Sequence, residues 1–141
     1  MNQPLRVLIV DDEASQRAGL AGMVSAWGML ADTASDGVEA LEKLEHIQVD
    51  VIVTDLKMPR MDGFELLDKL RNMGDSPPAI ALTAYGSMAS AVKTVHELDA
   101  FWFVEKPIEA SMLEALVRRA ASQGRLRNDT RSLEMQLRYI Q

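Results

Sequence analysis

Side chains suited to phosphoryl chemistry recur at five points along this sequence. Asp11, Asp12 and Asp55 supply carboxylates, Thr83 supplies a hydroxyl, and Lys106 supplies an ammonium group. Three carboxylates brought close together would repel one another, and a hard divalent cation with oxygen ligands, such as magnesium, would relieve that repulsion. A carboxylate attacks phosphorus when a metal and a nearby cation neutralise the transferring group. These residues therefore predict a phosphoryl-accepting site, provided that the fold brings them together.

Each residue has a distinct role in such a site. Asp55 is the best candidate for the nucleophile, because it would lie between the acidic pair and the two other groups. Lys106 offers a mobile positive charge to one phosphate oxygen, and the hydroxyl of Thr83 can donate a hydrogen bond to another. The backbone carbonyl of Lys57, two residues past Asp55, is a further possible metal ligand.

The elements that must position these residues alternate along the chain. Branched and apolar runs predict strands, and apolar residues at helical spacing predict helices between them. The predicted strands cover 5–10, 29–34, 49–54, 79–83 and 101–104, and the predicted helices cover 14–27, 36–44, 64–73, 87–98 and a last one from about 109. This alternation predicts an α/β fold with an open, doubly wound parallel sheet of five strands, since a closed barrel would need nearly twice the length.

The candidate residues lie at or just beyond the ends of four of the five predicted strands. In open parallel sheets, the functional crevice lies beyond the carboxyl ends of the strands. We therefore expect the acidic pair, Asp55, Thr83 and Lys106 to converge there. A lone aspartate after a strand is usually a helix cap or a loop residue, but five suitable residues at four strand ends favour a common site.

The composition of the chain excludes several other classes of protein. The 141 residues include 48% hydrophobic and 26% charged residues, which is typical of one globular domain. The absence of cysteine excludes a disulfide framework and a thiol nucleophile. No apolar run is long enough for a membrane span, and we expect a cytoplasmic protein. Residues 1–117 carry 19 acidic against 9 basic residues, which disfavours direct binding of nucleic acid by this domain, whereas 118–141 carry 2 against 6.

The motifs around these residues resemble one known family. They are Val-Leu-Ile-Val-Asp-Asp-Glu at 7–13, Val-Thr-Asp-Leu-Lys-Met-Pro at 53–59 with Met-Asp-Gly at 61–63, Leu-Thr-Ala at 82–84 and Glu-Lys-Pro at 105–107. In this order and spacing they resemble the receiver domain of two-component response regulators over about residues 5–122. The stretches 83–87 and 101–108 are most similar to receivers of NtrC-type transcriptional activators.

The resemblance implies a fold and a set of roles. The fold would be flavodoxin-like with strand order 2-1-3-4-5. Asp11 and Asp12 would bind magnesium, Asp55 would accept the phosphoryl group from a sensor histidine kinase, and Thr83 and Lys106 would contact the phosphoryl oxygens. Such a domain promotes its own phosphorylation and dephosphorylation but does not turn over an external substrate.

Two further residues have roles implied by the resemblance. Phe103 falls at the position of the switch aromatic, although a plain core residue is the simpler interpretation from the residues alone. The Lys106–Pro107 peptide would be cis.

Departures from the family pattern fall away from the predicted site. Asp99 stands where glycine is usual, and Trp102 stands where a small or polar residue is common. Strand alternation predicts that Phe101 and Phe103 share one sheet face and that Trp102 lies on the other. Trp102 is then either an interface anchor or a packed surface residue.

The domain organisation follows from the end of the chain. We expect a receiver domain at 1–122 and, at 123–141, a linker helix that extends the last helix of the domain. Leu126, Leu133 and Ile140 recur every seven residues, with Leu116 and Leu137 between them, so this helix carries a short coiled-coil seam that favours a homodimer. A frayed linker is the alternative. The resemblance implies an output ATPase and a DNA-binding domain in the full-length protein, so the chain is either a fragment or a stand-alone receiver.

Three other functions compete with this interpretation. A metal-dependent hydrolase with an aspartyl nucleophile would need an acid–base residue beside Asp55, and the residue two positions on is Lys57. A flavin-binding carrier is disfavoured because the acidic loop 11–13 would repel a phosphate. A degenerate receiver used only for docking is disfavoured because all five site residues are present.

Overall fold

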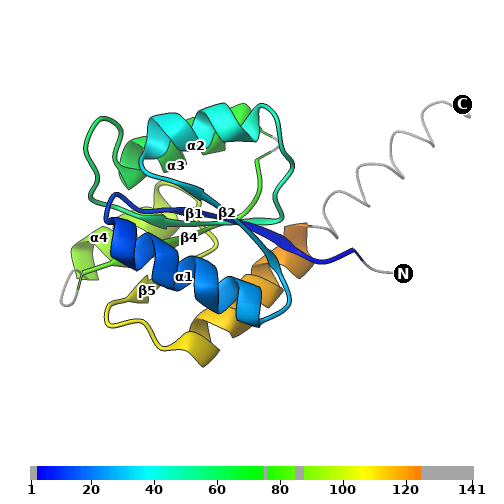
Figure 1. Ribbon diagram of the computed structural model, residues 1–141. Helices are drawn as coiled ribbons and strands as arrows, with labels where there is room; N and C mark the ends of the chain where they lie inside the picture. The colour runs from blue at the N-terminus through cyan, green and yellow to red at the C-terminus, as the bar shows by residue number, and fades with distance from the viewer. Residues whose placement is uncertain (1–2, 75, 85–87, 125–141) are drawn as a thin grey trace, which may run out of the picture.

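A five-stranded parallel sheet forms the centre of the molecule. The computed structural model describes residues 3–74, 76–84 and 88–124. The strands are β1 (Arg6–Val10), β2 (Leu30–Ala34), β3 (Val51–Asp55), β4 (Ala79–Thr83) and β5 (Trp102–Glu105), and they lie in the order β2-β1-β3-β4-β5 (Figure 1). Every neighbouring pair is parallel. The predicted doubly wound, flavodoxin-like fold with order 2-1-3-4-5 is therefore confirmed.

Helices cover both faces of the sheet. They are α1 (Ala14–Ala26), α2 (Gly37–Leu44), α3 (Gly63–Met73), α4 (Met88–His96) and a C-terminal helix over residues 110–124. In Figure 1, α2 and α3 lie on one side of the sheet, and α1 and the C-terminal helix lie on the other. α4 packs against β4 and β5.

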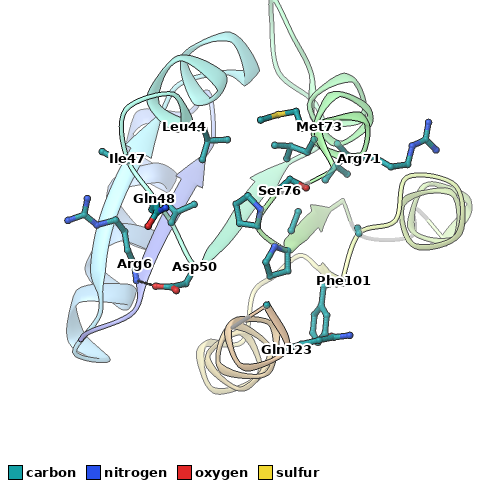
Figure 2. A pocket seen from close by; sticks show the side chains of 18 of the residues that line it. Arg6, Leu44, Ile47, Gln48, Asp50, Arg71, Met73, Ser76, Phe101 and Gln123 are labelled. Atoms are coloured by element: carbon teal, nitrogen blue, oxygen red, sulfur yellow. Dashed lines mark hydrogen bonds between the residues drawn. The ribbon is translucent and has the colours of Figure 1, made fainter. Parts of the chain in front are cut away.

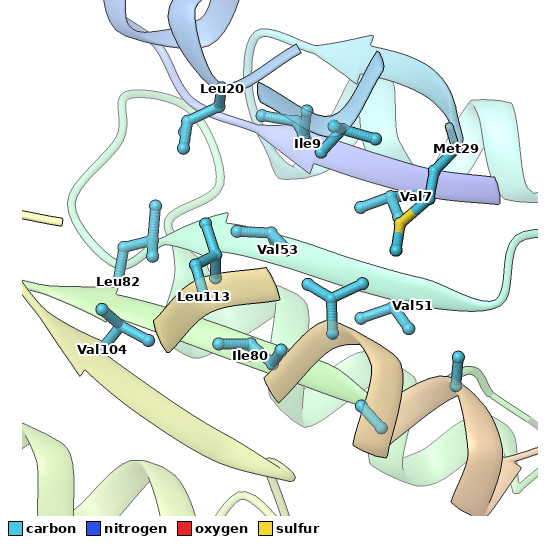
Figure 3. Close-up of a cluster of buried hydrophobic side chains, with 14 residues drawn as sticks. Val7, Ile9, Leu20, Met29, Val51, Val53, Ile80, Leu82, Val104 and Leu113 are labelled. Carbon is cyan, nitrogen blue, oxygen red and sulfur yellow. The ribbon is translucent and has the colours of Figure 1, made fainter. Parts of the chain in front are cut away.

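Two buried clusters hold these layers together. The first joins alternate strand residues such as Ile9 and Val53 to Leu20 of α1 and Leu113 of the C-terminal helix (Figure 3). The second joins the intervening strand residues to α2 and α3, through Leu8, Val10, Ile52, Ala40, Leu66 and Leu67. Because the central strands are buried on both faces, their sequences read as continuous apolar runs, as parallel strands between two helical layers do.

Local capping sets several helix boundaries. The Asp36 carboxylate accepts the Glu39 N–H at 2.9 Å at the start of α2. The Asp62 carboxylate does the same for the Glu65 N–H at 2.9 Å at the start of α3. Gly28, with φ of 83°, follows the end of α1 and confirms the predicted stop.

The entry into β5 corrects one sequence expectation. Phe101 packs on the first cluster, whereas Phe103 packs on the second, so the two rings lie on opposite faces of the sheet. Phe101 precedes the strand, in a bend where the alternation of side chains does not apply. The rings of Trp102 and Phe103 stack with centroids 5.6 Å apart, although they are neighbours in β5.

The loop before this bend explains one departure from the family pattern. Asp99 has φ of 58°, in the left-handed region that glycine adopts most easily. Aspartate tolerates this conformation better than most residues, because its short side chain can hydrogen-bond locally.

The C-terminal helix continues across residue 122 to residue 124. The boundary that we expect at 122, and the linker at 123–141, stay predictions. Leu126, Leu133, Leu137 and Ile140 of the expected coiled-coil seam lie outside the described residues. Within the described part of the chain, no helix is both long and apolar enough to cross a membrane.

Candidate phosphorylation site

The predicted site residues meet at the carboxyl edge of the sheet. One oxygen from each of Asp11, Asp12 and Asp55 lies within 4.8 Å of the other two. The Lys106 ammonium donates to Asp55 Oδ2 at 3.0 Å, and the Lys106 backbone N–H donates to the Thr83 carbonyl at 2.8 Å. The strand register causes this convergence, because Val10 pairs with Thr54, Asp55 with Leu82, and Thr83 with Glu105.

Hydrogen bonds hold both oxygens of the Asp55 carboxylate. Oδ1 accepts the N–H of Leu56 at 2.7 Å and the N–H of Lys57 at 3.4 Å, and Oδ2 accepts from Lys106. The Asp55 side chain is only 14% exposed, so it is largely shielded but still open to a small donor. The backbone of Lys57 therefore lies directly against the candidate nucleophile.

Asp11 is the fully buried carboxylate of the site. Its side chain is fully buried, and its Oδ1 accepts the Glu13 N–H at 2.9 Å. Burial raises the pKa of Asp11, and the negative charges of Asp55 and Asp12 raise that pKa further, against the lowering effects of the Glu13 N–H and Lys106. An ionised Asp11 thus favours an additional cation at this point.

These donors fit magnesium. The three carboxylates offer hard oxygen ligands within 4.8 Å of one another, which suits a small divalent cation that keeps some of its water. Asp12 is exposed, so the cluster opens toward solvent on one side.

The Asp62-Gly63 pair accompanies this site because position 63 has no room for a side chain. The Gly63 N–H donates to the Leu56 carbonyl at 2.9 Å. A Cβ at Gly63 would lie 2.3 Å from the carbonyl oxygen of Asp55 and 2.7 Å from the Leu56 Cα. Only glycine lets the first turn of α3 approach the backbone of the candidate nucleophile this closely.

An ion pair that sequence reasoning missed holds the loop after β3. The Arg60 guanidinium donates to both oxygens of Asp36, at 2.6 and 3.1 Å. These hydrogen bonds hold the pKa of Asp36 below its usual range. The Gly37 N–H also donates to the Met61 carbonyl at 3.1 Å, so the loop is tied to the start of α2. Neither contact has a signal in the sequence, because the partners are 24 residues apart.

Gln16 is the second residue that sequence reasoning missed. Its side chain lies between Lys106 and Asp11. A signal was present, because Gln16 belongs to the same helical stripe as the buried residues Leu20 and Val24. A polar residue on the buried face of a helix, one turn after an acidic pair, is a candidate site residue.

Of the remaining predicted residues, Thr83 and Pro107 also lie at this edge of the sheet, whereas Phe103 lies within β5. Thr83 is buried at the end of β4, and the Lys106–Pro107 peptide is cis. Phe103 is partly buried against the second cluster, and Trp102, which stacks on it, is 48% exposed.

A separate hollow of about 1260 Å³ lies at the opposite edge of the sheet. It is lined near the amino ends of the strands by Arg6, Asp50, Ser76 and Phe101, among others (Figure 2). The Arg6 backbone N–H donates to Asp50 there at 2.8 Å. None of the predicted site residues lines this hollow, so it is distinct from the candidate site.

Comparison with known proteins shows the family. The family described as "Response regulator receiver domain" matches residues 7–118. The chain therefore belongs to the response regulator receiver domains.

Individual relatives agree with this assignment. The chain is 42% identical to "Probable transcriptional regulator ycf27" of Guillardia theta over 113 residues, which are 80% of this chain and 44% of the relative. It is 33% identical to "Regulatory protein AtoC" of Escherichia coli (strain K12) over 132 residues, 94% of this chain and 28% of the relative. The crystal structure of NtrX from Brucella abortus in complex with ATP superposes with a TM-score of 0.85 at 28% identity, covering 93% of this chain and 30% of that one.

The relatives also define the limits of the assignment. AtoC and NtrX are NtrC-like regulators, in agreement with the resemblance found in the motifs. The curated relatives carry the names of a transcriptional regulator, a response regulator and a regulatory protein. The chain spans about half of the length of the curated relatives, or less.

Proposed function

We propose that this receiver domain accepts a phosphoryl group on Asp55, with magnesium, and passes the signal on by a change of conformation. The observation that carries the proposal is the place of the Asp55 carboxylate, 3.0 Å from the Lys106 ammonium and within 4.8 Å of the oxygens of Asp11 and Asp12. A positive group and a cation-binding pair thus flank the same nucleophile.

The transfer itself follows from these contacts. An oxygen of Asp55 forms a bond to phosphorus while the bond from phosphorus to the donor breaks, and the donor leaves with the electron pair. As charge develops on the transferring group, the Lys106 ammonium donates to one phosphoryl oxygen, and the Thr83 hydroxyl donates to another. Magnesium, held by Asp11, Asp12, Asp55 and the Lys57 carbonyl, would supply charge neutralisation.

Labelling with a radioactive phosphodonor such as acetyl phosphate tests this proposal. Asp55→Asn removes the nucleophile and should abolish the label. Asp68→Asn is a matched control on α3, where the carboxylate pairs with Arg71 at 2.6 Å, and its labelling should be unchanged. Undiminished labelling of Asp55→Asn would overturn the assignment.

The proposed switch uses Thr83 and Phe103. Movement of Thr83 toward the phosphoryl group would free space that the ring of Phe103 can fill, so phosphorylation would bias an existing two-state equilibrium. The stacked ring of Trp102 offers a reporter of this movement. In a Trp27→Phe variant, acetyl phosphate should change the fluorescence of Trp102, and an unchanged spectrum in fully phosphorylated protein would contradict the switch.

Partners form a further part of the proposal. A sensor histidine kinase in the cytoplasm would be the phosphodonor, and an ATPase and a DNA-binding domain would be the output in the full-length protein. The much greater lengths of AtoC and NtrX support an output region beyond the receiver. A homodimer is expected, and light scattering with and without phosphodonor would measure the mass of the assembly.

A further inference from the structure

We infer that Gln16 is a positioning residue that holds Lys106 over the phosphoryl site. The orientation of a glutamine amide follows from its hydrogen-bond partners. In the orientation that satisfies both neighbours, the Gln16 Oε1 accepts from Lys106 Nζ at 3.2 Å and Nε2 donates to Asp11 Oδ2 at 3.2 Å. One neutral side chain therefore joins the site's cation to its most buried carboxylate. This inference rests on the proposed function of Asp55.

The fold presents Gln16 to the site from a defined direction. Gln16 lies in the first turn of α1, and Leu20 and Val24 on the same stripe are buried against the sheet. A small hollow of about 280 Å³ separates this part of α1 from the loop after β5. Of the residues that line it, Gln16 and Lys106 alone carry polar side chains; the others are Gly19, Leu20, Met23, Pro107 and Ile108. On this side of Lys106, the amide of Gln16 is thus the acceptor that the lining provides.

The contact between Lys106 and Gln16 matters because phosphorylation changes the charge of Asp55. An ammonium group has three N–H donors. Asp55 Oδ2 takes one at 3.0 Å, Gln16 takes the second, and the third remains for a phosphoryl oxygen. Phosphorylation turns the Asp55 carboxylate into an acyl phosphate, which weakens the original ion pair. The bond to Gln16 does not depend on that charge, so it keeps Lys106 in place throughout the transfer.

Gln16 also fixes the orientation of Asp11. The Glu13 N–H holds Oδ1 at 2.9 Å, and the amide of Gln16 holds Oδ2. With one donor on each oxygen, the carboxylate has a single orientation toward Asp55 and Asp12. Preorganisation of this kind lowers the cost of ordering the site when the donor binds.

The test is the substitution Gln16→Met, which keeps the length and the helix propensity but removes both hydrogen bonds. The initial rate of labelling by acetyl phosphate should fall about tenfold, as expected when a hydrogen bond to a charged group is lost. Gln123→Met, an exposed glutamine in the C-terminal helix, is the matched control and should label at the natural rate. Gln16→Ala is a second variant with the same expectation if the methionine variant folds poorly.

A double-mutant cycle separates positioning from a general structural effect. In a Lys106→Met background, the added Gln16→Met change should lower the residual labelling rate by clearly less than tenfold, because only its bond to Asp11 is left to lose. A second readout needs no phosphodonor: in metal-free protein, the NMR signal of the Lys106 ammonium nitrogen should shift and broaden in Gln16→Met but not in Gln123→Met.

The outcomes distinguish this inference from the proposed function. Labelling of Gln16→Met at the natural rate, or an equal tenfold loss in both backgrounds, would overturn the role of Gln16 while Asp55 remains the acceptor. Labelling of Asp55→Asn at the natural rate would instead overturn the proposed function, whatever the result at position 16.

Discussion

Asp11→Asn should stabilise the metal-free protein although it removes a site residue. The Asp11 oxygen lies within 4.8 Å of oxygens of both Asp12 and Asp55. At an effective dielectric constant of about 20, two like charges at this separation repel by about 3.5 kcal/mol. Lys106 and the Glu13 N–H offset most of the two repulsions. We expect a net gain of about 1–2 kcal/mol in the free energy of unfolding.

The pH dependence of this gain has a definite sign. The pKa of Asp11 is raised in the folded protein, so its ionised form destabilises the fold above that pKa. The destabilisation disappears as the pH falls through the folded-state pKa and the carboxyl is protonated. The advantage of Asp11→Asn should therefore be largest at neutral pH and shrink in acid.

Thermal unfolding measures both effects. In excess chelator, Asp11→Asn should melt about 3–8 °C higher than the natural chain, given the entropy of unfolding of a domain of this size. Excess magnesium should raise the melting temperature of the natural chain by mass action but leave that of Asp11→Asn nearly unchanged. Asp32→Asn is the control, because its carboxylate pairs with Arg6 at 3.5 Å and its loss should not stabilise the fold. A lower melting temperature for Asp11→Asn in chelator would refute the reasoning.

Three other predictions test a close backbone contact, a left-handed residue and an ion pair. Gly63→Ala should destabilise the fold by about 1–3 kcal/mol in urea unfolding, because its Cβ would meet backbone atoms, whereas Gly22→Ala on the exposed side of α1 should stabilise it by about 1 kcal/mol; equal effects would contradict the close contact. Asp99→Gly should raise the melting temperature by a few degrees and Asp99→Ala should not, since only glycine relieves the positive φ. The pKa of Asp36 is lowered in the folded protein, so its ionised form stabilises the fold above the unfolded-state pKa near 3.8. This contribution is lost as the pH falls through the folded-state pKa. The stability difference between the natural chain and Arg60→Met should therefore close below about pH 4, and a difference that is constant with pH would exclude the ion pair as its cause.

Much of the fold could be predicted from local patterns. The strand at Ala79–Thr83 has the predicted bounds, and the other strands differ from their predicted bounds by one or two residues. Buried parallel strands are recognised as continuous apolar runs, and helices are recognised by the spacing of their apolar residues. The entry into β5 was the exception, because the bend at Phe101 depends on the left-handed Asp99 and on packing against the first cluster rather than on periodicity.

The sequence alone identified the five candidate site residues. Asp11, Asp12, Asp55, Thr83 and Lys106 lie at or just beyond strand ends, and the carboxyl ends of parallel strands meet at one edge of the sheet. No distances are needed to predict this convergence, because the alternation of strands and helices already predicts a parallel sheet.

The tertiary structure decided how these residues are held. The bond of Lys106 to Asp55 joins residues 51 positions apart, and the contact of Lys106 with Gln16 joins residues 90 positions apart. Such contacts depend on the register of the strands and on how α1 packs against the sheet. The helical spacing of Gln16, Leu20 and Val24 indicates which face of α1 is buried, but not which residues that face meets. The sequence therefore named the candidate nucleophile and its neighbours, and the packing of α1 against the sheet added the amide between Lys106 and Asp11.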